Sequence, residues 1–109
     1  MERKNLVAMA GNPVTLTGNP VKAGDTAPDF KVLTSEMKEV TLADFAGKTV
    51  LISVTPSLDT PVCDLQATRF NQEAGSLPGD AVLLNISVDL PFALARFCAA
   101  KGIDRVKTL

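Results

Sequence analysis

Apolar positions along this chain fall into short runs that alternate with polar stretches rich in glycine and proline. Residues 49–54 are β-branched and nearly all apolar, which is typical of a strand buried on both faces. A helix is predicted over residues 61–74, and its apolar positions recur at about helical spacing: Leu65, Ala67, Phe70 and Ala74. A second apolar run at 81–88 completes a strand–helix–strand unit, for which we expect parallel pairing.

The segments on either side of this unit predict further short elements. Before it come a hairpin, a half-buried strand with its return strand, and a helical turn: 5–10 with 14–17, 29–33 with 39–41, and 42–48. After it, Pro91 opens a second helix that Asp89 or Leu90 caps, Gly102 ends it, and 103–109 begins another strand. The Asp89 carboxylate is expected to be a solvated or capping charge. Leu94, Phe97 and Cys98 share one face of that second helix.

The length of 109 residues allows one α/β domain with a modest core. We expect a single unit over 1–109, made of an N-terminal hairpin at 1–20 and a core at 21–109. A helix-covered parallel sheet normally continues beyond the point that Leu109 reaches. The sequence is therefore expected to be truncated, without its C-terminal strands and helix.

Charge and hydropathy exclude several classes of partner. The chain has 11 Lys and Arg against 12 Asp and Glu, a net charge of −1, so it offers no basic surface for nucleic acid or acidic lipid. No apolar run is long enough to span a membrane, and residues 6–10 are too short for a signal peptide. We therefore expect a cytoplasmic protein, in which a disulfide is usually transient and catalytic or sensory.

The absence of histidine narrows the chemistry further. It removes cysteine–histidine and serine–histidine nucleophile pairs and the usual zinc ligand sets. Two cysteines, Cys63 and Cys98, are too few for a structural zinc site. We expect neither a metal nor a cofactor, and packing, disulfide formation and redox chemistry stay open for the two thiols.

Cys63 has the local sequence of a reactive thiol. Thr60 is a good helix N-cap and Pro61 is favoured at the first helical position, so Cys63 is predicted in the first helical turn. Unpaired N–H groups and the positive end of the helix dipole there stabilise a thiolate. The flanking carboxylates of Asp59 and Asp64 act in the opposite direction.

The helix start alone is too weak to activate a thiol. Lowering a cysteine pKa from about 8.5 to about 6 requires about 3.4 kcal/mol, whereas a helix terminus typically supplies about 0.3–1 kcal/mol. The remainder must come from a hydrogen bond, with the Thr60 hydroxyl as the nearest candidate, or from a cation. Arg69 lies more than a turn further along the helix and is expected to point elsewhere.

The loop Thr-Pro-Ser-Leu-Asp-Thr-Pro-Val-Cys-Asp at 55–64 closely resembles the active-site loop of bacterial thiol peroxidases, which are atypical two-cysteine peroxiredoxins. The likeness extends over three further stretches: 24–30, 84–93 and 96–104. The N-terminal hairpin resembles the one that this subgroup adds to the thioredoxin-like fold. Long matches in the same order along the chain make the resemblance specific.

The resemblance implies a role for each matching residue. Cys63 would be the peroxidatic cysteine that attacks a hydroperoxide, and Cys98 the resolving cysteine that forms an intrachain disulfide with it. Thr60 would hydrogen-bond the thiolate and the peroxide, and Pro61 would shield them from water. Thioredoxin would reduce the disulfide, and a homodimer is common in the family. Because disulfide Cα atoms lie about 4.4–6.8 Å apart, the first turn after Thr60 would have to unwind.

One family feature has no counterpart in this sequence. The family uses an arginine beside the peroxidatic thiolate, from a strand beyond the position of Leu109, and no arginine here matches it: Arg3, Arg69, Arg96 and Arg105. A catalytically impaired fragment that acts only as a binding or dimerisation module is therefore the alternative. A general disulfide oxidoreductase is disfavoured because the chain has no Cys-x-x-Cys pair.

Overall fold

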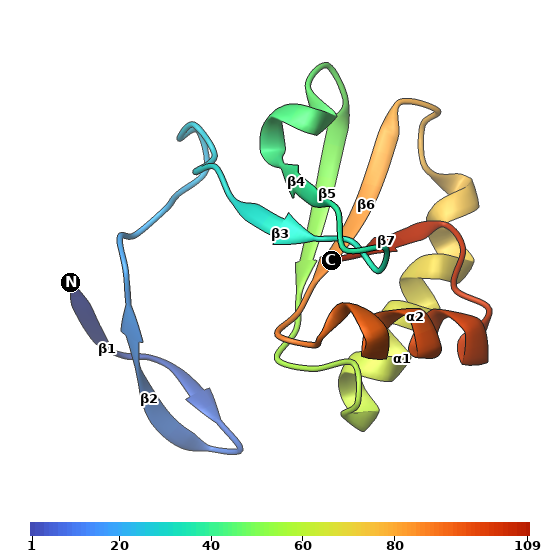
Figure 1. Ribbon diagram of the computed structural model, residues 1–109. Coiled ribbons are helices and arrows are strands. Elements are labelled where there is room, and N and C mark those ends of the chain that lie inside the picture. The colour runs from blue at the N-terminus through green and yellow to red at the C-terminus, as the bar shows by residue number, and fades with distance from the viewer.

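The computed structural model describes all residues 1–109 (Figure 1). Eleven elements follow one another along the chain: β1 (Glu2–Met9), β2 (Asn12–Thr17), β3 (Lys31–Leu33), β4 (Glu39–Thr41), the 3₁₀ turn η1 (Leu42–Phe45), β5 (Thr49–Val54), α1 (Pro61–Glu73), the 3₁₀ turn η2 (Ala74–Ser76), β6 (Ala81–Ile86), α2 (Pro91–Lys101) and β7 (Val106–Thr108). The predicted hairpin, the strand–helix–strand unit and the second helix are all present. Their ends differ from the predicted ends by a few residues, as fraying element ends usually do.

The centre of the fold is a parallel sheet with the strand order β5-β6-β7. Val50 pairs with Val82 and Ile52 with Leu84, so side chains at matching positions share a face. In Figure 1, β5 and β6 run side by side in the same direction, and both helices begin at the carboxyl ends of these strands. The predicted parallel pairing is confirmed.

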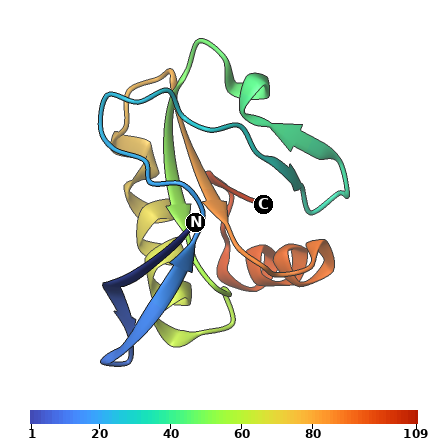
Figure 2. The same ribbon diagram turned by 90° about the vertical axis from the view of Figure 1, so that its left-hand side faces the viewer.

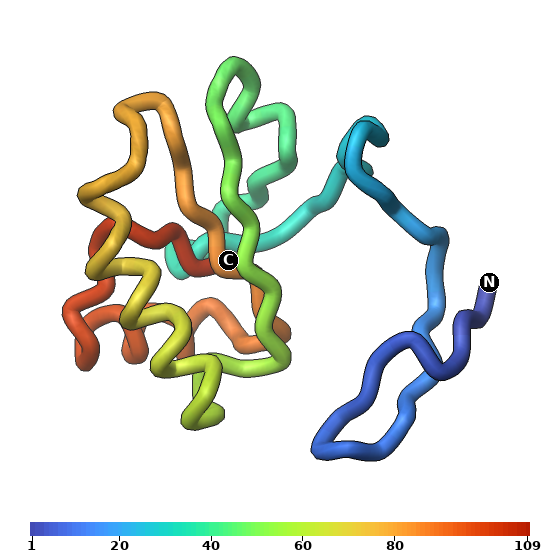
Figure 3. The backbone as a smooth tube through the Cα atoms, turned by 180° about the vertical axis from the view of Figure 1, so that it is seen from behind, coloured from blue at the N-terminus to red at the C-terminus, as the bar shows by residue number.

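Different layers cover the two faces of this sheet. On one face, Leu84 and Leu109 pack with Phe45 of η1 and with valines of the β3–β4 hairpin. On the other face, Leu83 and Val106 pack with Phe70 of α1. Figure 3 shows α1 running back alongside the strands that it joins, and Figure 2 shows α1 and the β3–β4 hairpin on opposite sides of β5 and β6. The second helix, α2, packs beside α1, because its Phe97 and Cys98 contact the same cluster as Phe70.

The prediction that residues 49–54 are buried on both faces is wrong. Leu51 is 42% exposed, Ile52 39% and Val54 72%. The reason is that β5 is an edge strand, whose only backbone pairing in the sheet is with β6. Its outer edge and much of its apolar surface therefore lie open.

The buried face of α1 differs from the predicted one at a single position, Leu65. Leu65 is 70% exposed, whereas Cys63 and Ala67 are buried and Phe70 and Ala74 are half-buried. These four residues follow the helical repeat from Cys63 onward and form the face that meets the sheet and α2. The helix and the inward positions of Ala67, Phe70 and Ala74 are therefore confirmed, whereas the prediction for Leu65 is wrong, because Cys63 takes its place on the buried face.

The β1–β2 hairpin stands apart from the rest of the chain (Figures 1 and 3). An exposed linker follows it and leads to β3, and Leu6, Val7 and Met9 on the hairpin remain exposed. The predicted division at about residue 20 stays a prediction. Neither α1 nor α2 has the length and the apolar run that crossing a bilayer requires.

Candidate active site

Cys63 is the third residue of α1, in the first turn of the helix as predicted. Its side chain is 9% exposed and packs in a small apolar cluster with Leu58, Ala67 and Leu94. The Cys63 Sγ makes no hydrogen bond. The electrostatic stabilisation available to this sulfur therefore comes from the N-terminus of α1. The thiol thus lies at a helix N-terminus and is largely covered by hydrocarbon.

Thr60 occupies the N-cap position and Pro61 the first helical position, as the sequence predicts. The Thr60 side chain does not cap the helix, because its hydroxyl donates to the Ser57 carbonyl at 3.0 Å. The hydroxyl is therefore engaged within the preceding turn and is not bonded to Cys63. Pro61 is exposed at the point where the loop ends and α1 begins.

Cys98 lies on α2 and is half-buried. Its Sγ is 3.3 Å from the Thr108 hydroxyl of β7, and either atom can donate in that contact. Cys63 and Cys98 are both free thiols and belong to neighbouring clusters, which Phe97 joins by packing against each. The fold therefore brings the two cysteine-bearing helices together without joining their sulfur atoms.

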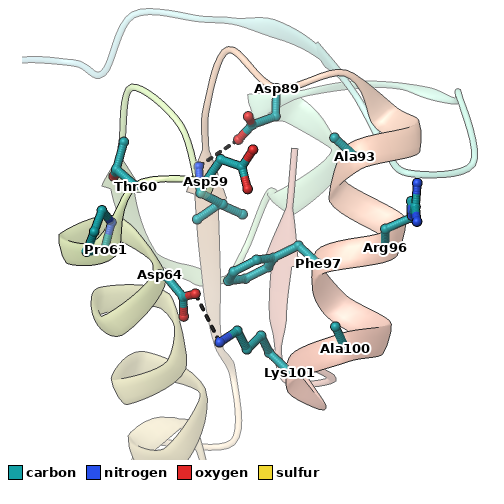
Figure 4. Close-up of a pocket in the computed structure, with 11 residues that line it drawn as sticks. Asp59, Thr60, Pro61, Asp64, Asp89, Ala93, Arg96, Phe97, Ala100 and Lys101 are labelled. Carbon is teal, nitrogen blue, oxygen red and sulfur yellow. Dashed lines mark hydrogen bonds and ion pairs between the residues drawn. The ribbon is translucent and has the colours of Figure 1, made fainter.

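No cation reaches the Cys63 sulfur. Arg69 points away from it and pairs with Glu73 at 3.0 Å, which agrees with the expectation from helix geometry. Lys101 of α2 pairs with Asp64 at 3.1 Å and so ties the two helices together beside the cysteine (Figure 4). The charged groups around the helix start hold elements in place and leave the thiol without a positive partner.

A cavity of about 720 Å³ opens between the start of α1 and α2 (Figure 4). Thr60, Pro61 and Asp59 line it from the loop, and Arg96 and Phe97 line it from α2. Cys63 is not among the lining residues, because Leu58 and Leu94 pack against it in the buried cluster. A small molecule in this cavity would meet the turn that carries the cysteine before it met the sulfur.

Asp89 is the residue of this region that the sequence did not single out. It lies between β6 and α2, and its carboxylate accepts hydrogen bonds from the Ser57 hydroxyl at 2.7 Å, the Leu58 N–H at 2.8 Å and the Ser87 hydroxyl at 2.8 Å. Partial burial opposes ionisation, but the bonds from Leu58, Ser57 and Ser87 outweigh it and lower the pKa of Asp89. The sequence reading as a solvated or capping charge is therefore wrong.

The missed contact had only a weak signal in the sequence. Asp89 directly precedes a Leu-Pro helix start, where Asp89 and Leu90 were the two predicted caps, and the N-cap of α2 is Leu90. The partner at Leu58 is 31 positions away along the chain. Only the alignment of β5 with β6 reveals that the two loops meet.

Sequence comparisons connect this geometry to known proteins. The sequence model of the Redoxin family matches residues 22–109. A thiol peroxidase of Bacillus subtilis is 57% identical over 103 residues, which are 94% of this chain and 61% of that protein. A thiol peroxidase of Staphylococcus aureus is 52% identical over 103 residues, which are 94% of this chain and 62% of that protein. The chain thus spans about three fifths of the length of these curated relatives.

A solved structure agrees with the sequence comparisons. The crystal structure of a peroxiredoxin-like protein from Aquifex aeolicus superposes with a TM-score of 0.85 and 37% sequence identity. The superposition covers 97% of this chain and 60% of that one. The resemblance drawn from the motifs and the expected thioredoxin-like α/β fold with an added N-terminal hairpin are both confirmed.

Proposed function

This chain belongs to the redoxin family, and from that premise we propose that it is a thiol-dependent peroxidase acting on hydrogen peroxide and organic hydroperoxides. The observation that carries the proposal is the position of Cys63 in the first turn of α1, directly after Thr60 and Pro61 at the end of β5. The names of the thiol peroxidase relatives support the same reaction class. A helix start is a setting in which a thiolate is favoured.

In the proposed reaction, the Cys63 thiolate attacks the terminal oxygen of the hydroperoxide. An S–O bond forms, the O–O bond breaks, and the alkoxide leaves as an alcohol, or as water from hydrogen peroxide, after taking up a proton. Cys63 is then a sulfenic acid. We assign Thr60 to hydrogen-bond the thiolate and the peroxide, which requires its hydroxyl to leave the Ser57 carbonyl, and Pro61 to shield the reacting atoms from water.

Resolution would follow from Cys98. Its sulfur attacks the Cys63 sulfenic sulfur, the S–S bond forms and water leaves. Because Cys63 and Cys98 lie in separate clusters, the first turn of α1 must unwind to bring their Cα atoms within the disulfide range of about 4.4–6.8 Å. A dithiol donor of the thioredoxin kind would then reduce the disulfide in the cytoplasm, where such bonds are transient.

The test is a thiol titration before and after one equivalent of hydroperoxide. We expect peroxide to remove both titratable thiols and to create one intrachain disulfide, detected by non-reducing peptide mapping. Cys63→Ser should abolish peroxide consumption, whereas Cys98→Ser should still consume one equivalent and stop at the sulfenic acid, which a dimedone probe would label. Peroxide consumption by Cys63→Ser at the original rate would disprove the assignment.

The open edge of β5 favours a second candidate, a binding module that acts through dimerisation. Leu51, Ile52 and Val54 leave an apolar, unpaired strand edge, and the Cys63 sulfur has no cation beside it. Such an edge readily pairs with another strand, and two copies of one edge can pair across a two-fold axis. In this case a homodimer joined at β5 would be the functional form, and peroxide turnover would be impaired.

Sedimentation velocity distinguishes the two candidates when it is combined with the peroxide assay. We expect the chain to form a dimer that Val54→Lys dissociates, because a buried ammonium at a strand interface is costly. Val62→Lys is the matched control, since Val62 is exposed to the same degree but lies on α1. A monomer at every concentration, or equal effects of the two lysines, would eliminate dimerisation through β5.

A further inference from the structure

We propose that Asp89 is the positioning residue of the Cys63 loop. Its carboxylate joins the two loops that leave the carboxyl ends of β5 and β6, through three hydrogen bonds of 2.7–2.8 Å. Two of the donors, Ser57 and Leu58, lie in the loop that leads into α1. The third donor, Ser87, lies beside Asp89 and keeps the carboxylate turned towards that loop.

The influence of Asp89 passes to the sulfur through Leu58. The Leu58 N–H donates to Asp89, and the Leu58 side chain, 2% exposed, packs in the same cluster as Cys63. Fixing the Leu58 backbone therefore fixes the side chain that covers the thiol. Without the carboxylate, the buried Leu58 N–H would lose its partner and the loop would gain freedom to lift away.

A second route runs through Ser57. Its hydroxyl donates to Asp89 at 2.7 Å and accepts from the Asp59 N–H at 3.0 Å, while its carbonyl accepts the Thr60 hydroxyl. Asp89 thus holds the residue that in turn holds the Thr60 side chain at the helix start. One carboxylate controls both the cover over Cys63 and the position of the N-cap hydroxyl.

The other carboxylates of the loop have different surroundings. Asp64 pairs with Lys101, and the carboxylate of Asp59 has no hydrogen-bond or ion-pair partner although Asp59 lines the same cavity (Figure 4). Asp59 lies a few residues before Cys63 and carries the same charge as Asp89. It is therefore a matched control that separates the effect of the three hydrogen bonds from the effect of local charge.

As a consequence, the loop covers the Cys63 thiol, and Asp89 limits the opening of the loop that would expose it. This inference rests on the proposed function in treating Cys63 as the reacting thiol, and it says that the loop must release Asp89 before Cys63 can reach Cys98. Access to the Cys63 sulfur can be measured with an alkylating reagent, without peroxide.

The experiment compares the rates at which iodoacetamide alkylates Cys63 and Cys98 in the full chain, resolved by peptide mass spectrometry at several pH values. We expect Asp89→Ala to speed alkylation of Cys63 at least about tenfold, as loss of a charge-assisted hydrogen bond predicts. Alkylation of Cys98 should change little. Asp59→Ala removes a negative charge close to Cys63 but none of the three hydrogen bonds, so it should speed alkylation of Cys63 far less than Asp89→Ala does and should leave Cys98 unchanged.

Asp89→Asn provides a second variant of nearly the same shape, in case Asp89→Ala does not fold. It keeps an acceptor for the Leu58 N–H but loses the charge, so we expect an intermediate rate at Cys63. Ser57→Ala, which removes one donor and leaves the carboxylate, should also give an intermediate rate. Both rates must exceed that of Asp59→Ala to support the role of Asp89.

Two outcomes would overturn the inference. If Asp89→Ala accelerates Cys63 and Cys98 by the same factor, Asp89 stabilises the fold as a whole and does not position the loop. If the Cys63 rate is unchanged in both Asp89 variants, the carboxylate does not limit access. The proposed function is tested separately, since a chain that consumes no peroxide can still show the selective change at Cys63.

Discussion

Leu94 is the best position at which to test the packing between the two helices. It lies on α2, is 1% exposed, and shares one cluster with Leu58, Cys63 and Ala67. Ala67 is fully buried and too small to fill space that its neighbour vacates. The substitution Leu94→Ala should therefore leave a cavity against the face of α1 that carries Cys63.

The expected loss of stability is large for a chain of this size. Replacing a buried leucine by alanine costs about 2–5 kcal/mol, and limited room for collapse places Leu94→Ala near about 3 kcal/mol. A small domain has a total unfolding free energy of about 5–15 kcal/mol. At about 4–8 °C per kcal/mol, the melting temperature should fall by about 12–24 °C.

Urea unfolding followed by circular dichroism, with a thermal melt, measures both quantities. The control is Leu65→Ala, because Leu65 has the same side chain on α1 but is 70% exposed. A surface substitution of this kind should change stability by no more than about 0.5 kcal/mol. Equal losses for the two variants, or a larger loss for Leu65→Ala, would refute the assignment of the inward face of α1.

Two further predictions concern polar contacts between loops. The pKa of Asp89 is lowered in the folded state, with desolvation opposed by three hydrogen bonds, so its stabilising contribution is present at neutral pH and is lost as the pH falls below about 4 and through the folded pKa. The stability gap between the parent chain and Asp89→Asn should therefore narrow between about pH 7 and about pH 3 in urea titrations, and an unchanged gap would contradict the assignment. Asn71→Ala should destabilise the chain by about 1–3 kcal/mol, because the Asn71 amide oxygen accepts hydrogen bonds from the N–H groups of Asp104, Arg105 and Val106. Hydrogen exchange at these three amides should therefore accelerate more than exchange in β6. If hydrogen exchange accelerated uniformly throughout the chain, Asn71 would not stabilise this loop specifically.

The local sequence was sufficient to place the cysteine at a helix start. Thr60 and Pro61 mark where α1 begins, Gly102 has φ of +66° and ends α2, and the apolar runs on either side of α1 pair in parallel. The helix boundaries depend on backbone preferences and on neighbours a few residues away, and the parallel pairing depends on the helical connection between the two runs. They could therefore be predicted without knowing how the chain packs.

Burial was harder to predict, because it depends on what lies beside each element. Residues 49–54 have the composition of a central strand, yet β5 lies at the edge of the sheet, and its apolar side chains remain partly open. Leu65 and Leu94 are the same residue type at comparable helical positions. Only Leu94 faces the neighbouring helix and becomes buried.

The sequence by itself thus determined the order of elements and the first-turn position of Cys63, which follow from short-range preferences of the backbone. It also determined the parallel unit, which follows from the connection of two apolar strands through a helix. The tertiary structure alone decided which side chains cover that sulfur, and that Asp89 secures the loop from 31 positions away. The physical reason is that a hydrogen bond or an apolar contact between distant segments exists only after the strands have aligned. No local pattern specifies which partners that alignment brings together.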